Sequence, residues 1–233
     1  MTEPAMLDWP LCRNARDLGG IPLADGGAIR IGALVRSDNL DQLDDRGIAA
    51  VRAAGVSRIV DLRSEWECET FPSPFAHDAL WLNAPLTDPA DPDVSTLALV
   101  QQYRMLLDEH AHRFATAIAG IAEAPPGCVV VTCHAGKDRT GLVTALALDL
   151  VGASSDAIAA DYAQFGDSHI HRTTTIGDRP NVPLPELSLP RAETMIHILE
   201  HLRHQYGGAA AYLVHGGATA DHLTSLKTRL SAA

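Results

Sequence analysis

The sequence predicts an α/β fold with a mostly parallel central sheet of about four or five strands flanked by helices. Short β-branched segments alternate along the chain with longer segments of helical periodicity. Helices that separate strands favour right-handed crossovers between parallel strands. One β-branched segment, Cys128–Thr132, is placed at the centre of the sheet. In such folds ligands gather at the carboxyl ends of the strands.

Each element is assigned from its periodicity. Alternating or β-branched residues predict strands at Ala28–Val35, Val56–Leu62, Ala79–Asn83 and Cys128–Thr132. Apolar residues at spacings of three or four predict one long helix or two shorter ones within Ser95–Glu123. The same spacing predicts helices at Leu40–Ala54, Arg139–Val151, Ser154–Phe165, Arg191–Tyr206, Ala209–Val214 and Ala220–Leu230.

Composition limits the size of the core and the classes of partner. The chain has 233 residues, 46% hydrophobic and 20% charged, so we expect one domain over residues 1–233. The net charge of -11 argues against nucleic-acid or anionic-membrane partners, because those surfaces attract basic proteins. An anionic substrate must therefore be attracted locally.

Two segments bear on localisation. Met1–Asp17 lacks the basic start and apolar stretch of an export signal. Gly141–Ala153, the most apolar later stretch, is shorter than the roughly 20 residues that cross a bilayer. We expect a cytoplasmic protein without stable membrane insertion, whose four cysteines are thiols. The sequence leaves open whether Cys12 or Cys68 pairs with Cys133.

A proline-rich connection, Arg179–Pro190, follows the helix that starts at Ser154. Long irregular segments often cover active sites, so about 154–190 is a candidate helical lid, with an inert surface connection as the alternative. Three polar residues just before this connection could touch substrate but are assigned no catalytic role. They are His169, His171 and Arg172.

The chemistry is expected in the loop between the central strand and the next helix. Its backbone N–H groups can point at phosphate oxygens, and its glycine permits tight curvature. The arginine can bind two phosphate oxygens, and the same positive groups favour the thiolate of the cysteine, which is the nucleophilic form. The loop is Cys133-His134-Ala135-Gly136-Lys137-Asp138-Arg139, and Thr140 after it can donate a hydrogen bond to the sulfur.

Two charged residues inside the loop have further expected roles. Asp138 is the candidate proton donor to the leaving oxygen and the base that activates water afterwards. The alternative is a structural carboxylate bonded to nearby amides. Lys137 is expected to add positive charge at the rim, which favours multiply phosphorylated or acidic substrates.

The segment from Cys133 to Gly141 resembles the loop of the protein tyrosine phosphatase superfamily. It is most similar to the bacterial atypical branch that mycobacterial protein tyrosine phosphatase B typifies. Other motifs in the same order extend the resemblance over most of the chain. They are Asn14–Gly20, Arg36-Ser37-Asp38, Asp61-Leu62-Arg63-Ser64 and Asp161-Tyr162.

The resemblance implies hydrolysis of phosphomonoesters through a phosphocysteine intermediate, with no metal or cofactor. It implies phosphorylated protein or lipid substrates: phosphotyrosine, phosphoserine or phosphothreonine, and phosphoinositides. In this branch the loop aspartate replaces the general acid of a mobile Trp-Pro-Asp loop, which this chain lacks. The family usually has histidine before the cysteine; here Thr132 stands there, so we expect a thiol that ionises less readily and an active enzyme.

Other readings compete with this one. His197, Glu200 and His201 match the H-x-x-E-H pattern of some zinc hydrolases, but they lie opposite the apolar stripe of their helix and are expected on a solvated face. A non-catalytic phosphate-binding module is a second alternative, although nucleophile and arginine are both present. Sulfur or arsenic chemistry would need a nearby resolving cysteine, and Cys128 is expected on the opposite sheet face from Cys133.

Four charged residues in the N-terminal half are expected to support the loop as ion pairs and to take no part in catalysis. They are Arg16, Asp17, Asp61 and Arg63.

Overall fold

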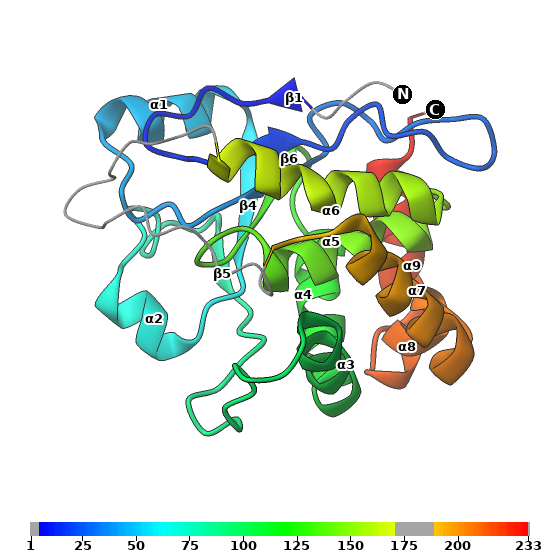
Figure 1. The fold of residues 1–233 in the computed structure, drawn as a ribbon. Helices are drawn as coiled ribbons and strands as arrows, with labels where there is room; N and C mark the ends of the chain where they lie inside the picture. Colours follow the sequence, from blue (N-terminus) through cyan, green and yellow to red (C-terminus); the bar gives the residue numbers. More distant parts are fainter. Residues whose placement is uncertain (1–4, 171–188, 233) are drawn as a thin grey trace.

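A computed structural model describes residues 5–170 and 189–232 and contains a six-stranded sheet of order β1-β2-β3-β6-β4-β5 (Figure 1). The strands are β1 (Ala5–Met6), β2 (Arg16–Asp17), β3 (Leu34–Ser37), β4 (Val56–Asp61), β5 (Trp81–Asn83) and β6 (Cys128–Thr132). β3, β6, β4 and β5 are parallel, whereas β1 and β2 extend one edge in antiparallel pairing. The predicted α/β fold with a mostly parallel sheet is confirmed.

Helices cover both faces of the sheet (Figure 1). They are α1 (Asp45–Ala53), α2 (Glu65–Thr70), α3 (Leu99–Glu109), α4 (Ala111–Ala122), α5 (Asp138–Leu150), α6 (Ser155–Ile170), α7 (Ala192–Tyr206), α8 (Ala209–His215) and α9 (Ala220–Leu230). The stretch predicted as one helix or two is two, separated at His110. The short helix α2 and the two-residue strands β1 and β2 were not predicted.

The strand predicted at Ala28–Val35 is shifted in the structure, where β3 starts at Leu34. Ala28 and Ile29 form only isolated bridges, and the chain turns at Gly32, whose φ is 72°. A positive φ of this kind interrupts an extended strand, which explains why regular pairing starts two residues later.

Two hydrophobic clusters lie on opposite faces of the sheet, and β6 contributes to both. Val129 and Val131 belong to the larger cluster with α3 to α9, whereas Cys128 and Val130 belong to the smaller one beside α1. The five residues of β6 are all buried. This burial on both faces is typical of a central parallel strand, and it explains the unbroken β-branched sequence.

The carboxyl ends of three parallel strands meet at one edge. Thr132 of β6 is paired with Ser37 of β3 and with Asp61 of β4. The residues after these strand ends, including Cys133, therefore emerge side by side. Since β6 lies between β3 and β4, its predicted central position is confirmed, and this edge is the one at which a ligand site is expected.

The predicted lid and membrane properties concern the second half of the chain. The helix of the candidate lid is α6, while residues 171–188, which include His171 and Arg172, lie outside the described residues. Among the helices of the described ranges, none combines the length and apolar character needed to span a bilayer.

Candidate active site

Cys133 lies directly after β6, and the loop that follows leads into α5. The side chain of Cys133 is buried, with 2% of its surface exposed. Gly136 has a φ of 66°, and a Cβ atom there would lie 2.5 Å from the carbonyl oxygen of Ser37. Only glycine fits this tight approach of the loop to the end of β3. The backbone of the loop therefore turns back toward the sheet at Gly136.

The outer side of the loop is held by hydrogen bonds to its carbonyl oxygens. The side-chain amide of Asn14 donates to the carbonyl oxygen of Gly136 at 2.9 Å and to that of Ala135 at 3.3 Å. Arg36 donates to the carbonyl oxygen of Gly136 at 2.8 Å. Because the carbonyl and N–H groups of a peptide point in opposite directions, these contacts favour N–H groups that face the interior of the loop.

The two supporting arginines are anchored on Asp161 of α6. Arg16 Nε lies 2.9 Å from one carboxylate oxygen of Asp161, and Arg36 Nη1 lies 2.6 Å from the other. All three side chains are buried. Burial would raise the pKa of Asp161, but the two guanidinium charges outweigh it and lower the pKa. Arg16 also donates to Asn14, so this ion-pair group positions the residues that hold the loop.

Asp38, directly after β3, and Thr132, directly before Cys133, belong to a second group of contacts that supports the loop. The buried carboxylate of Asp38 accepts hydrogen bonds from the backbone N–H groups of Arg13 and Asn14. Burial raises the pKa of Asp38 to about 6, although these hydrogen bonds oppose the shift. Thr132 donates its hydroxyl to the carbonyl oxygen of Asp38 at 2.7 Å. The threonine that replaces the family's histidine thus joins the cysteine strand to this support.

Arg139, in the first turn of α5, is paired with Glu67 of α2. Its two terminal nitrogens lie 2.5 Å and 2.8 Å from the two carboxylate oxygens. Glu67 also accepts the N–H of Ser64 at 2.9 Å, and Ser64 Oγ accepts the N–H of Glu67, which is a capping box. Burial would raise the pKa of Glu67, but Arg139 lowers it to about 2. Glu67 therefore fixes the guanidinium with an ionised carboxylate.

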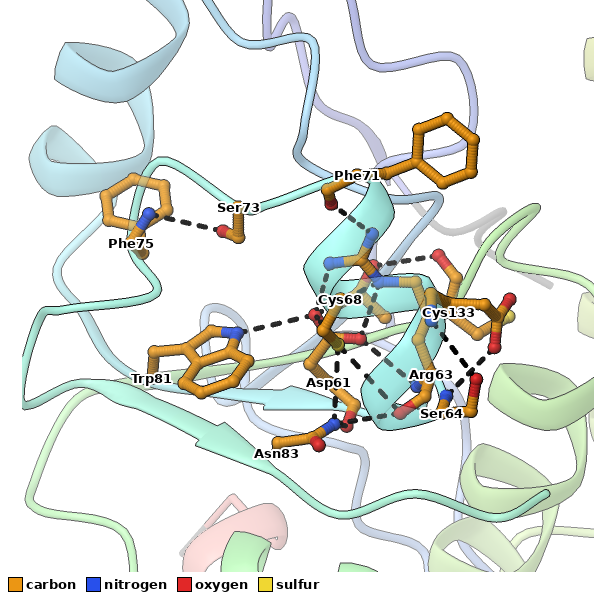
Figure 2. Close-up of polar contacts among 12 residues, drawn as sticks. Asp61, Arg63, Ser64, Cys68, Phe71, Ser73, Phe75, Trp81, Asn83 and Cys133 are labelled. Atoms are coloured by element: carbon orange, nitrogen blue, oxygen red, sulfur yellow. Dashed lines mark hydrogen bonds and ion pairs between the residues drawn. The ribbon is translucent and has the colours of Figure 1, made fainter. Parts of the chain in front are cut away.

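A buried pair lies at the end of β4, close to α2 (Figure 2). Arg63 donates to Asp61 at 2.7 Å and to the carbonyl oxygen of Phe71 at 2.8 Å. Trp81 Nε1 donates to the same carboxylate oxygen at 3.3 Å. Beside this pair, burial and the charge of Asp61 raise the pKa of Cys68 to about 12. Cys68 is therefore a poor nucleophile near neutral pH.

Asp138 is the first residue of α5, and two groups contact its carboxylate, one of which is a tyrosine that contacts a second tyrosine. Tyr103 of α3 donates its hydroxyl to Asp138 Oδ1. Lys137 Nζ lies 3.2 Å from the same oxygen. The Tyr162 hydroxyl of α6 lies 2.7 Å from that of Tyr103. The Lys137 side chain is only 6% exposed, so its ammonium group lies inside the site, in contrast to the rim position expected from the sequence.

The remaining loop residues occupy distinct positions. His134 is exposed, and its ring centroid lies 6.2 Å from that of Phe71. Ala135 is half-buried. The Thr140 hydroxyl is buried and has no hydrogen-bond partner within residues 5–170 and 189–232. The expected bond from Thr140 to the sulfur of Cys133 is therefore absent from the described residues.

A hollow of about 580 Å³ opens beside α2. Thr87 lines it and lies 3.3 Å from Arg139 Nη1. The exposed side chains of Glu65, Trp66 and Glu69 from α2 also line it. None of residues 133–139 lines this hollow, and Thr87 is the residue that connects it to Arg139.

The other candidate residues lie elsewhere or act as supports. His201 contacts Asp108 at 2.8 Å, and His197 contacts Glu200 at 3.4 Å on the exposed face of α7. The described parts of the chain contain no cluster of three or more His, Cys, Asp or Glu suited to hold a metal. Asp17 accepts the N–H groups of Gly19 and Gly32 and forms no ion pair with Arg16.

All four cysteines lie in the described ranges, where no disulfide joins any two of them. Cys128 faces the smaller hydrophobic cluster and Cys133 the larger one. This is the arrangement that the odd separation of the two residues on an extended strand predicts. Burial raises the pKa of Cys128 to about 12. The geometry therefore offers Cys133 no resolving cysteine on its own strand.

Sequence reasoning missed two residues that contact the loop. Glu67 had a local signal, because Ser64-Glu65-Trp66-Glu67 matches a capping box, but its partner Arg139 is 72 residues away. Tyr103 is one of the apolar residues, at spacings of three or four, that predict a helix within Ser95–Glu123. The position of Tyr103 in this helical pattern does not indicate that its hydroxyl donates a hydrogen bond to Asp138.

Comparisons with known proteins agree with this geometry. The model of the tyrosine phosphatase family matches residues 7–232. The chain is 30% identical to the triple specificity protein phosphatase PtpB of Mycobacterium tuberculosis over 70% of each chain. It is 30% identical to a tyrosine-protein phosphatase of Nostoc commune, over 91% of this chain and 79% of that protein. A provisionally named tyrosine-protein phosphatase of Cupriavidus necator is also 30% identical, over 76% of this chain and 71% of its own. The chain therefore belongs to the tyrosine phosphatase family.

Proposed function

We propose that this phosphatase hydrolyses phosphomonoesters through a covalent phosphocysteine at Cys133, with phosphorylated proteins as its substrates. The observation that carries the proposal is the position of Cys133 at the base of a loop whose carbonyl groups are held outward. The N–H groups that remain, the amino end of α5 and Arg139 form a site of positive potential for a phosphate dianion.

In the first step, the thiolate of Cys133 attacks phosphorus and the bond between phosphorus and the leaving oxygen breaks. The electron pair of that bond goes to the leaving oxygen, which takes a proton from the carboxyl group of Asp138. Arg139 binds two of the equatorial oxygens, where negative charge is held in the transition state. Glu67 keeps the guanidinium in one orientation through its two contacts.

In the second step, the carboxylate of Asp138 takes a proton from a water molecule whose oxygen attacks the phosphocysteine. The bond between sulfur and phosphorus breaks, and its electron pair returns to Cys133 as the thiolate. Inorganic phosphate leaves, and Asp138 is again protonated for the next turnover. One residue therefore serves as acid and then as base, which a position inside the loop permits.

The surroundings of the loop favour phosphoproteins over phosphoinositides. The ammonium group of Lys137 is buried against Asp138, so it provides little attraction for a second phosphate outside the loop. The hollow beside α2 is lined by Glu65 and Glu69, whose carboxylates repel a polyanionic headgroup, whereas Asp88 is paired there with Arg113 at 3.7 Å. The relatives named tyrosine-protein phosphatases support phosphotyrosine as the proposed main substrate, with phosphoserine and phosphothreonine as further ones.

A substrate panel tests the proposal. Phosphotyrosine, phosphoserine and phosphothreonine peptides and soluble phosphoinositides are assayed with wild type, Cys133→Ser and Asp138→Asn. We expect no measurable turnover with Cys133→Ser, and a large loss with Asp138→Asn. Undiminished turnover by Cys133→Ser would reject the covalent mechanism. A kcat/KM higher for phosphoinositides than for every phosphopeptide would reject the substrate assignment.

A further inference from the structure

Only one of the two carboxylate oxygens of Asp138 is contacted by side chains of the described residues. Tyr103 and Lys137 both contact Oδ1, and none of the described residues forms a hydrogen bond with Oδ2. The side chain of Asp138 is 39% exposed, so without these contacts it could adopt several rotamers. The two contacts therefore leave Oδ2 as the oxygen available to a substrate.

The tyrosine that makes this contact is fixed by its own surroundings. Tyr103 is 2% exposed, and its ring packs edge-to-face against that of Tyr162, with centroids 6.2 Å apart and planes at 83°. Burial raises the pKa of Tyr103 well above its usual value, and the charge of Asp138 adds to the shift. The phenol therefore stays protonated and donates. Since its hydrogen is directed to Asp138, Tyr162 is the donor between the two hydroxyls.

We propose that Tyr103 is a positioning residue for proton transfer, which presents Oδ2 of Asp138 to the leaving oxygen of the substrate and stabilises the carboxylate that forms there. The proposal rests on the proposed function, in which Asp138 gives its proton to that oxygen. The proton leaves from Oδ2, and the negative charge left on the carboxylate is shared with Oδ1. Tyr103 and Lys137 donate to Oδ1, so their hydrogen bonds strengthen as the proton leaves.

The test compares Tyr103→Phe with a matched removal of a buried tyrosine hydroxyl, Tyr212→Phe. Tyr212 is completely buried and donates to the carbonyl oxygen of Leu107, away from Asp138. Both variants are assayed on esters that range from p-nitrophenyl phosphate, whose leaving oxygen needs little protonation, to phenyl phosphate and a phosphotyrosine peptide. Asp138→Asn and the double variant of Tyr103→Phe with Asp138→Asn complete a cycle.

We expect Tyr103→Phe to lower kcat/KM, which reports the step in which the leaving oxygen departs, by roughly 10-fold to 100-fold for phenyl phosphate and by only about 3-fold for p-nitrophenyl phosphate. Tyr212→Phe should leave both rates unchanged. In the Asp138→Asn background, Tyr103→Phe should cause no further loss, because the group through which it acts is gone. Tyr162→Phe should show the same dependence on the leaving group, with a smaller loss of rate. It is the variant that tests the proposal if Tyr103→Phe does not fold.

Other results would overturn the proposal. An equal loss on all esters, or the same loss with and without the Asp138 carboxylate, would show that Tyr103 acts only on the packing of the site. Unchanged rates in Tyr103→Phe would show that the hydrogen bond has no kinetic role. If Asp138→Asn itself does not slow turnover, the proposed function fails at its general acid, which is a separate outcome.

Discussion

Replacing Glu67 by glutamine keeps the shape of the side chain and removes the charge that pairs with Arg139. Burial would raise the pKa of Glu67, but Arg139, together with hydrogen bonds with Ser64, lowers it from 4.5 to about 2. A shift of that size corresponds to about 3 kcal/mol at about 1.4 kcal/mol per pH unit. Because the side chain remains 17% exposed, solvent screening reduces our expectation to about 2 kcal/mol.

The pH dependence has a definite sign. The folded-state pKa is depressed, so the stabilisation is fully present above about pH 4.5 and is lost as the pH falls toward about 2. Urea unfolding of wild type and Glu67→Gln should therefore differ by about 2 kcal/mol near pH 7 and by less than half of that near pH 3.

Glu65→Gln is the control for this experiment, since Glu65 lies in the same helical turn, is exposed and contributes no contact to Arg139. Its free energy of unfolding should stay within about 0.5 kcal/mol of wild type at every pH. The reasoning is refuted if Glu67→Gln is as stable as wild type near pH 7, or if its deficit is the same at all pH values.

Three further changes test the supports of the loop. Gly136→Ala should lower kcat/KM at least roughly 100-fold while the protein stays folded, because its Cβ would lie 2.5 Å from the carbonyl oxygen of Ser37; near-normal kinetics would contradict this. Burial raises the pKa of Asp38 to about 6, so the folded protein loses stability as this carboxyl group ionises. The free energy of unfolding of wild type, measured by urea titration, should therefore fall by about 3 kcal/mol between about pH 4 and pH 7. Asp38→Asn should not show this fall. Asp161→Asn leaves two buried arginines without their counter-charge and should destabilise the protein by about 3–5 kcal/mol by urea unfolding; a loss below about 1 kcal/mol would exclude the proposed role.

The parts of the fold that the sequence predicted best are those with strong local patterns. β6 has the predicted bounds because Cys128–Thr132 is buried on both faces and four of its five residues, Val129 to Thr132, are β-branched. The helix α9 also has the predicted bounds, set by Thr219 at its N-cap and its apolar spacing. In contrast, the six residues of α2 include no buried residue, so this helix has no apolar stripe to detect.

The candidate site also contains one part with a strong local pattern and other parts without one. The loop from Cys133 to Arg139 is contiguous, so its spacing alone indicates a phosphate site. Its supports come from distant segments: Asp161 contacts Arg16 across 145 residues and Arg36 across 125. Of the four residues that the sequence indicated as ion-paired supports, Arg63 does pair with Asp61 and Arg16 pairs with Asp161, whereas Asp17 accepts only backbone N–H groups. The sequence did not indicate which partner each group has, because partner choice depends on which strands and helices pack together.

The most direct test of the account is detection of phosphate on Cys133 during turnover. Wild type and Asp138→Asn are mixed with p-nitrophenyl phosphate, whose leaving oxygen needs little protonation, quenched within the first turnover, and digested for mass spectrometry. We predict a phosphoryl group on the peptide that contains Cys133, at higher occupancy in Asp138→Asn, where attack by water is slower. Release of phosphate at the full rate with no adduct on Cys133 would contradict the account.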